Sequence, residues 1–188
     1  MVANFLDLDW CDRSDHIFLV GMLHELAHSL VAKSQGIPVD SITLFMFGGV
    51  SNIREEPKSP GNEFVMAFIG PLTSLVLGIS LILLSSIGLN VPSVQEIQPM
   101  DFLGRLNAAR TLGIWLGVIN ISLGVFNLIP GYPLDGGRVL RSILWAITKN
   151  LRKATRWASY VGQAIAWAMI ISGIAMIFGA RIPLLGQG

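Results

Sequence analysis

Residues 64–84, with the sequence FVMAFIGPLTSLVLGISLILL, contain no charged side chain. A helix needs roughly 20 apolar residues to cross the hydrocarbon core of a bilayer, so this stretch predicts a membrane-spanning helix. Two further uncharged runs, 111–129 and 157–180, meet the same requirement, and a fourth apolar run, 16–32, is only marginally long enough. Charged residues make up 13% of the 188 residues, about half the share found in a soluble domain. The sequence therefore predicts an all-α polytopic membrane protein with about four transmembrane helices.

We expect a single domain over residues 1–188, with core helices at about 16–34, 63–85 and 111–129 and a further helix at about 156–180. Lipid provides no hydrophobic force that drives helices together, so membrane helices associate closely through small residues. Gly70, Ser74 and Gly78 recur every four residues in the second predicted helix. We interpret this row as a packing surface for a neighbouring helix.

The segment between the first two predicted spans has the sequence of a β-hairpin. Two β-rich runs, 42–47 and 50–53, flank Gly48 and Gly49, which predicts two strands joined by a two-residue turn. The first run is unusually apolar for an aqueous loop. A hairpin can enter the membrane if its backbone is covered by protein, so we expect a short membrane-associated hairpin here.

Lysine and arginine are unevenly distributed between the predicted loops. Loops 33–63 and 130–156 share one side of the membrane and hold nine of the thirteen basic residues. Basic loops face the cytoplasm, so this side is predicted to be cytoplasmic. We interpret the basic run 149–156 as a topology signal, with any binding of anionic lipid secondary. No basic stripe alternates with aromatic residues, so nucleic acid is not an expected partner.

The first predicted span carries MLHELAHSL at residues 22–30. Ionisable side chains at membrane depth are costly and mark a functional hypothesis. His24 and His28 are four residues apart, so they share one helix face and can bind one metal ion. The spacing is the H-E-x-x-H of zinc metalloproteases, in which the glutamate is the general base. We predict one Zn2+ per chain, with His24 and His28 as ligands and Glu25 as the base; the alternative is two satisfied interior histidines and a glutamate ion pair.

A catalytic zinc needs a third protein ligand, and NLIPGYPLDGGRVL at residues 127–140 offers Asp135. Taken alone, Asp135 is better explained as the N-cap of the following helix, with Gly136 and Gly137 in the turn. The charge distribution, however, predicts His28 and Asp135 at a similar depth. That agreement favours Asp135 as a ligand, with the two glycines allowing the backbone to approach the metal closely.

Two asparagines lie on one face of the third predicted span. An amide in lipid needs a hydrogen-bond partner, and for Asn120 an interhelical hydrogen bond is the favoured role. For Asn127, which is closer to the predicted zinc depth, packing and donation to a developing oxyanion are equally plausible. We therefore name Asn127 as a candidate catalytic residue.

Four segments, HELAH, NLIPGYPLDGG, FIGPLTSLVLG and FMFGGVS, together resemble the site-2 protease family of intramembrane zinc metalloproteases. The resemblance covers about residues 16–180 and is greatest to the compact prokaryotic group that often carries CBS domains. It implies that His24, His28 and Asp135 bind zinc, that Glu25 is the general base, and that Asn127 lines the active site. Members usually carry a further helix on each side; neither these helices nor CBS domains are recognised in these 188 residues.

The resemblance also implies a function, namely hydrolysis of a peptide bond within or near a transmembrane helix of a membrane-protein substrate. The expected location is a prokaryotic plasma membrane, with the active site near the cytoplasmic side. A substrate helix must unwind first, because its amides are hydrogen-bonded internally, and a strand of the hairpin could hold it by β-augmentation. The alternative is a catalytically silent zinc-bearing homologue that binds membrane helices, which the intact Glu25 disfavours. A solute carrier would have polar residues scattered through several spans, whereas here they converge on two motifs.

Overall fold

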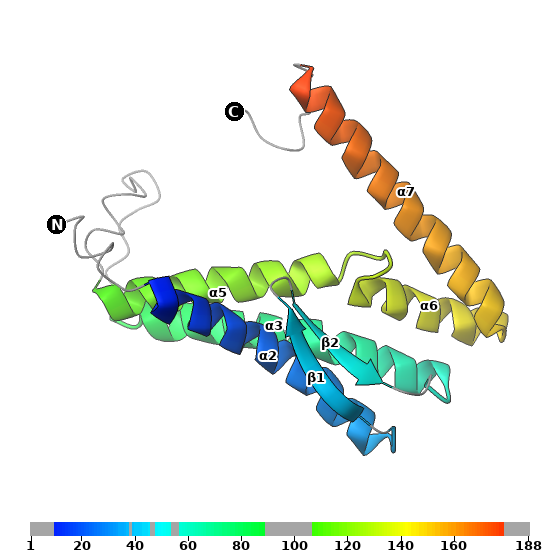
Figure 1. The fold of residues 1–188 in the computed structure, drawn as a ribbon, viewed down its shortest axis with the longest axis horizontal. Coiled ribbons are helices and arrows are strands. Elements are labelled where there is room, and N and C mark those ends of the chain that lie inside the picture. The colour runs from blue at the N-terminus through cyan, green and yellow to red at the C-terminus, as the bar shows by residue number, and fades with distance from the viewer. Residues whose placement is uncertain (1–9, 38, 46–47, 54–56, 89–106, 179–188) are drawn as a thin grey trace.

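The computed structural model describes residues 10–37, 39–45, 48–53, 57–88 and 107–178 (Figure 1). Its elements, in chain order, are α2 (Trp10–Ser34), β1 (Val39–Phe45), β2 (Gly48–Ile53), α3 (Pro60–Ser86), α5 (Ala108–Asn127), α6 (Asp135–Thr148) and α7 (Leu151–Ile177). The described part of the chain is therefore mainly helical. The helices predicted at 63–85, 111–129 and 156–180 correspond to α3, α5 and α7.

Three of the described helices, α3, α5 and α7, are long and apolar enough to cross a membrane. Large apolar side chains on their surfaces are exposed, among them Ile79, Val118 and Ile171, as expected for helices that face lipid. The chain is thus an integral membrane protein. The fourth predicted span corresponds to α2, which begins at Trp10 rather than near residue 16 and does not meet the same requirement. Its own motif residues His24, Glu25 and His28 lower its apolar content.

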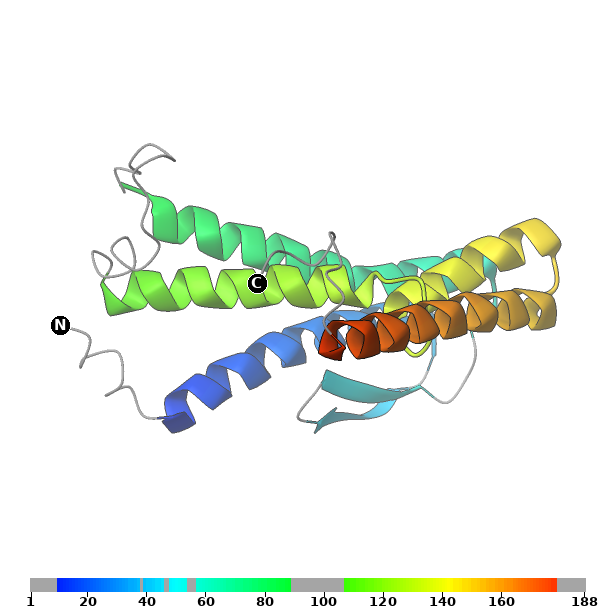
Figure 2. The ribbon, with the colours of Figure 1, turned by 90° about the horizontal axis from the view of Figure 1, so that it is seen from above.

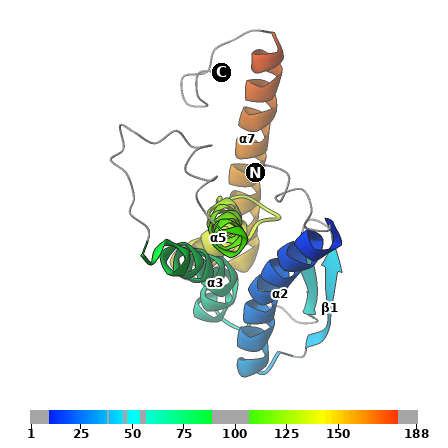
Figure 3. The same cartoon turned by 90° about the vertical axis from the view of Figure 1, so that its left-hand side faces the viewer.

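Helix α3 is the centre of the arrangement. It contacts α5, α2 and α6; Figure 3 shows α5 and α2 beside it, and Figure 2 shows α3 and α5 running side by side. Helix α7 contacts α6 and then leaves the bundle at an angle (Figure 1). The strand pair lies against α2 (Figure 3). Because α2 and α6 both contact α3, side chains that are more than 100 residues apart in sequence meet on its surface.

The strand pair differs from the predicted hairpin in the position of its turn. Strands β1 and β2 are antiparallel, with Phe45 opposite Gly48 and Leu44 opposite Gly49. Both glycines are therefore paired within β2, and the predicted turn at Gly48 and Gly49 was wrong. Glycine is common in turns, but it is also tolerated in a strand where backbones approach closely. The connecting residues 46–47 lie outside the described residues.

The crossing of α3 and α5 is formed by glycines. A Cβ atom added to Gly78 would lie 2.7 Å from the carbonyl oxygen of Gly117, and one added to Gly117 would lie 2.8 Å from that of Gly78. Further along, a Cβ on Gly124 would lie 3.0 Å from the carbonyl oxygen of Pro71. The two backbones are thus in direct contact, as expected where packing through small residues holds membrane helices together.

Replacing Gly78 with alanine is expected to push α5 away from α3, because the new methyl group overlaps a backbone carbonyl. Overpacking of this kind costs about 1–3 kcal/mol, and thermal unfolding in detergent measures it. Gly173→Ala in α7 is the matched control, since a Cβ there has no atom within 4 Å. A melting temperature for Gly78→Ala equal to that of Gly173→Ala would contradict the tight crossing.

Candidate metal centre

Three side chains from two helices converge beside α3. His24 and His28 come from α2, and Asp135 is the first residue of α6. Asp135 Oδ2 lies 3.1 Å from His24 Nε2 and 3.2 Å from His28 Nε2, and the two Nε2 atoms are 3.2 Å apart. Both histidines are at most 4% exposed, and the Asp135 side chain is 14% exposed. The three residues predicted as metal ligands are therefore brought together in a buried position.

The three distances suit one metal ion. Two ligand atoms that each lie about 2.0–2.1 Å from a tetrahedral zinc ion are roughly 3.3 Å apart. The observed separations of 3.1, 3.2 and 3.2 Å form nearly this triangle. Two histidines and one carboxylate also leave one position open, which is the arrangement of catalytic rather than structural zinc sites.

Hydrogen bonds from α3 orient both imidazole rings. His28 Nδ1–H donates to the carbonyl oxygen of Met66 at 2.6 Å, and a carbonyl can only accept. A neutral His28 therefore has its lone pair on Nε2, the atom that faces the other two groups. His24 Nδ1 is hydrogen-bonded to Ser74 Oγ at 2.9 Å. Such outer partners fix the tautomer and direction of a metal-binding histidine.

A cation would suit these three atoms. Because His28 Nδ1–H donates to the Met66 carbonyl, the neutral His28 ring directs its Nε2 lone pair at His24 Nε2 and at the Asp135 carboxylate. Burial acts to raise the pKa of Asp135, but the hydrogen bonds and charge of the two histidines outweigh it, so this pKa lies well below its usual range. A proton joins only one donor–acceptor pair at a time, whereas a single metal cation could contact all three atoms.

Gly70 on α3 leaves room for the Nε2 atoms of both histidines. A Cβ added to Gly70 would overlap His28 Nε2 and would lie 2.7 Å from His24 Nε2. Residue 70 must therefore lack a side chain for the two Nε2 atoms to lie where they do. The sequence interpretation of Gly70 as a residue that packs a neighbouring helix was therefore incomplete, because what lies against it is the histidine pair.

Asp135 does not cap α6. The N-cap of this helix is Leu134, and its first turn has no side-chain cap hydrogen bond. The capping alternative was therefore wrong, and the carboxylate is directed at the two histidines instead. The adjacent glycines have a different role from the predicted one. A Cβ on Gly136 would overlap the carbonyl oxygens of Leu128 and Ile129, so this glycine allows the preceding loop, rather than a metal, to approach.

The two predicted catalytic residues differ in their relation to this triangle. Glu25 follows His24 on α2, is half-buried, and interacts electrostatically with His28. Asn127 is the last residue of α5, and its Nδ2 donates to the carbonyl oxygen of Leu123 in the same helix at 3.0 Å. No hydrogen bond described for Asn127 reaches the histidines or Asp135, and its catalytic role stays a prediction. Asn120 likewise donates to Leu116 of its own helix, so the expected interhelical hydrogen bond is not made by this donor.

Three contributions to the site were missed from sequence: the Met66 carbonyl, the Ser74 hydroxyl and the space at Gly70. The four-residue spacing of Gly70 and Ser74 is visible in the sequence, but nothing in that spacing indicates which helix lies against it. A backbone carbonyl has no sequence signal, because every residue carries one.

Comparison with known proteins agrees with this geometry. Residues 16–169 match the model of the family described as peptidase family M50. The candidate zinc metalloprotease sll0528 of Synechocystis sp. is 44% identical over 157 residues, covering 84% of this chain and 38% of that protein. The zinc metalloprotease MJ0392 of Methanocaldococcus jannaschii is 35% identical over 158 residues, covering 84% of this chain and 41% of that protein.

A solved structure is also similar. The site-2 protease from Methanocaldococcus jannaschii matches with a TM-score of 0.66 and 32% sequence identity, covering 91% of this chain and 71% of that chain. The resemblance predicted from the sequence motifs is thereby confirmed. The chain spans about two fifths of the length of the curated relatives that it matches. The family model covers most of the 188 residues, and the relatives exceed 30% identity over more than two thirds of them, so this chain belongs to peptidase family M50.

Proposed function

We propose that this chain is the catalytic domain of an intramembrane zinc endopeptidase. The observation that carries the proposal is the triangle of His24, His28 and Asp135 atoms, 3.1–3.2 Å apart, around the space left by Gly70. The zinc metalloproteases among its relatives support zinc as the metal. In this proposal the whole of residues 1–188 acts as one domain and binds one Zn2+ per chain.

Glu25 is the proposed general base. A zinc ion held by His24, His28 and Asp135 would lower the pKa of a bound water molecule to about 7, which would make a nucleophile available at neutral pH. Glu25 follows the ligand His24 directly and can accept the proton of the attacking water, then donate it to the leaving amine. Ser74 and Met66 keep the imidazoles in the orientation that the reaction needs. Asn127 is proposed to donate a hydrogen bond to the developing oxyanion after leaving its contact with Leu123.

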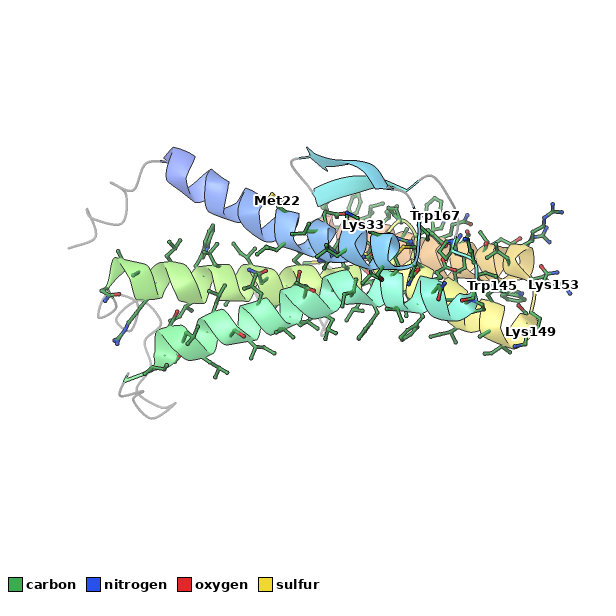
Figure 4. The ribbon with its side chains drawn as sticks, turned by 90° about the horizontal axis from the view of Figure 1, so that it is seen from below. Met22, Lys33, Trp145, Lys149, Lys153 and Trp167 are labelled. Carbon is green, nitrogen blue, oxygen red and sulfur yellow. The ribbon has the colours of Figure 1, made fainter. Side chains whose placement is uncertain are left out.

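The proposed substrate is a transmembrane helix of another protein, cleaved near the cytoplasmic side of a prokaryotic plasma membrane. Lys149 and Lys153 lie at one end of the bundle, and Lys33 lies towards the same end (Figure 4), which supports that end as cytoplasmic. In this proposal α2 is the fourth span and the strand pair beside it is associated with the membrane. An edge of that pair could accept the unwound substrate by β-augmentation.

A catalytically silent homologue that binds membrane helices is the second candidate. It would use the same metal site to hold its fold together. The feature that separates the two is Glu25, since a general base is needed only for hydrolysis. Zinc binding and cleavage therefore have to be measured separately to distinguish the two candidates.

Asp135→Ala is expected to remove zinc from the protein, because two histidines alone cannot complete the triangle. The measurement is zinc per chain in detergent-purified protein, together with zinc affinity by chelator competition. The loss should exceed the roughly 10–100-fold that removal of an outer hydrogen-bond partner causes. Wild-type zinc content in the variant would exclude Asp135 as a ligand, and a folded wild type without zinc would reject the proposal.

Gly70→Ala is expected to abolish zinc binding, although the substitution should not weaken helix α3 itself. Alanine in a helix is more favourable than glycine by about 1 kcal/mol, but its Cβ would overlap His28 Nε2. Gly61→Ala is the matched control on the same helix, because a Cβ there has no atom within 4 Å. Zinc affinity is measured for both. Equal affinities would disprove the requirement for space at Gly70.

Glu25→Gln is expected to retain zinc and lose cleavage. Loss of a general base lowers the rate by about 10²–10⁴-fold. The assay reconstitutes purified protein with a panel of labelled single-span membrane proteins in liposomes and follows the products on gels. Cleavage by wild type and by the variant at the same rate would rule out Glu25 as the base. Zinc-loaded wild type that cleaves no panel member would favour the silent homologue.

A further inference from the structure

A buried ion pair joins α3 to α6 beside the metal centre. Nε and Nη2 of Arg141 both donate to Oε1 of Glu63, with Nε at 2.5 Å. The Glu63 side chain is fully buried and that of Arg141 is 13% exposed. Neither residue contributes an atom to the triangle of His24, His28 and Asp135, and the proposed chemistry does not use them.

Glu63 belongs to the face of α3 that supports the histidines. Glu63, Met66, Gly70 and Ser74 are spaced by three, four and four residues, so they form one row along the helix, and all four are buried. Met66 and Ser74 are hydrogen-bonded to the two histidines, and Gly70 leaves space for their Nε2 atoms. The ion pair therefore occupies the end of the same row, about two turns from Gly70.

Arg141 is connected to both sides of Asp135. It lies six residues after Asp135 on α6, and its Cζ is 5.7 Å from the centre of the Tyr132 ring. Tyr132 belongs to the loop that leads into Asp135. The Arg141 guanidinium group, carried by the helix that begins at Asp135, thus lies against the loop before Asp135 and is paired with Glu63 on α3.

We propose that the Glu63–Arg141 ion pair positions the third metal ligand. The pair fixes where α6 lies along α3 and how α6 is rotated relative to α3, so that Asp135 meets His24 and His28. This inference rests on the zinc site proposed above. Helix α6 needs such a constraint, because it carries Asp135 while α2 carries the two histidines. Packing contacts without a specific polar partner permit one helix to slide on another, whereas an ion pair is satisfied at one register.

Stability is a weaker explanation for this pair. A buried ion pair is often replaced by apolar residues without loss of stability, while removal of a single partner leaves a buried charge unpaired. Glu63 Oε2 has no hydrogen-bond partner among the described residues, so the carboxylate depends on Arg141. Specification of a unique register is the best-attested role of buried polar contacts of this kind.

The test compares the full chain with E63M/R141M, R141M, R141K and the control R138M. Arg138 lies on the same helix and closer to Asp135, so R138M reports the effect of deleting a nearby charge. Each protein is measured for thermal unfolding, for zinc affinity by chelator competition, and for the visible absorption spectrum of bound Co2+. The cobalt spectrum responds to ligand geometry, which a purely structural role would leave unchanged.

We expect E63M/R141M to unfold at or above the wild-type temperature and yet to bind zinc about tenfold more weakly, with an altered cobalt spectrum. Zinc affinity should decrease from wild type to R141K to R141M, because lysine keeps the charge but not the planar group that reaches Tyr132. R138M should stay within about twofold of wild type.

Wild-type zinc affinity and cobalt spectrum in E63M/R141M would overturn the proposal, as would equal affinities for wild type, R141K and R141M. The R141K comparison keeps the test decisive if the double variant does not fold. Failure of the zinc site itself has a different signature, since wild type and R138M would then also bind no metal.

Discussion

The structure depends on one close approach, that of two histidines to a helix backbone at Gly70. Only a residue without a side chain leaves room for His24 and His28 Nε2 beside α3. The same approach brings His28 within hydrogen-bond distance of the Met66 carbonyl and His24 within reach of Ser74. A buried group of imidazoles and a carboxylate is unfavourable unless every polar atom is satisfied. The contacts that satisfy these three side chains are thus part of what allows α2 and α6 both to lie on α3.

Helix α3 accordingly serves two different kinds of contact. Along its row of Glu63, Met66, Gly70 and Ser74 it meets polar groups of α2 and α6. At Gly78 it meets the backbone of α5 with no polar side chain involved. Its remaining surface is apolar and exposed, as for Val76 and Leu83. In a membrane, where apolar surface is well solvated by lipid, the specific contacts are the small and polar ones.

The short loop between α5 and α6 determines where Asp135 lies. Gly136 allows the loop at Leu128 and Ile129 to fold back against the start of α6, so Asp135 begins its helix close to the end of α5. Helix α7 is attached to this region by a second close contact, since a Cβ on Gly162 would lie 2.9 Å from the amide nitrogen of Tyr132. The ligand loop is therefore held between three helices, which limits how far Asp135 can move from the histidines.

Much of this protein follows from local sequence alone. Uncharged runs of sufficient length predict α3, α5 and α7, because the thickness of the bilayer sets a simple requirement. The spacing of His24 and His28 predicts a shared metal, because residues four apart lie on one face of any helix. Charge distribution and motif predict Asp135 as a ligand, although local rules alone favour an N-cap.

Other features were decided only by tertiary structure. The turn between the strands was misplaced, because glycine is compatible with both a turn and a strand and the pairing partner decides between them. The roles of Gly70, Ser74 and the Met66 carbonyl depend on which helix lies against α3, and the Glu63–Arg141 pair joins residues 78 positions apart. Sequence determined which segments span the membrane and which residues can bind a metal. Only the packing of α2 and α6 on α3 decided how those residues meet. Their contacts join segments far apart in the chain, and the number of residues between two segments does not indicate how close they lie in space.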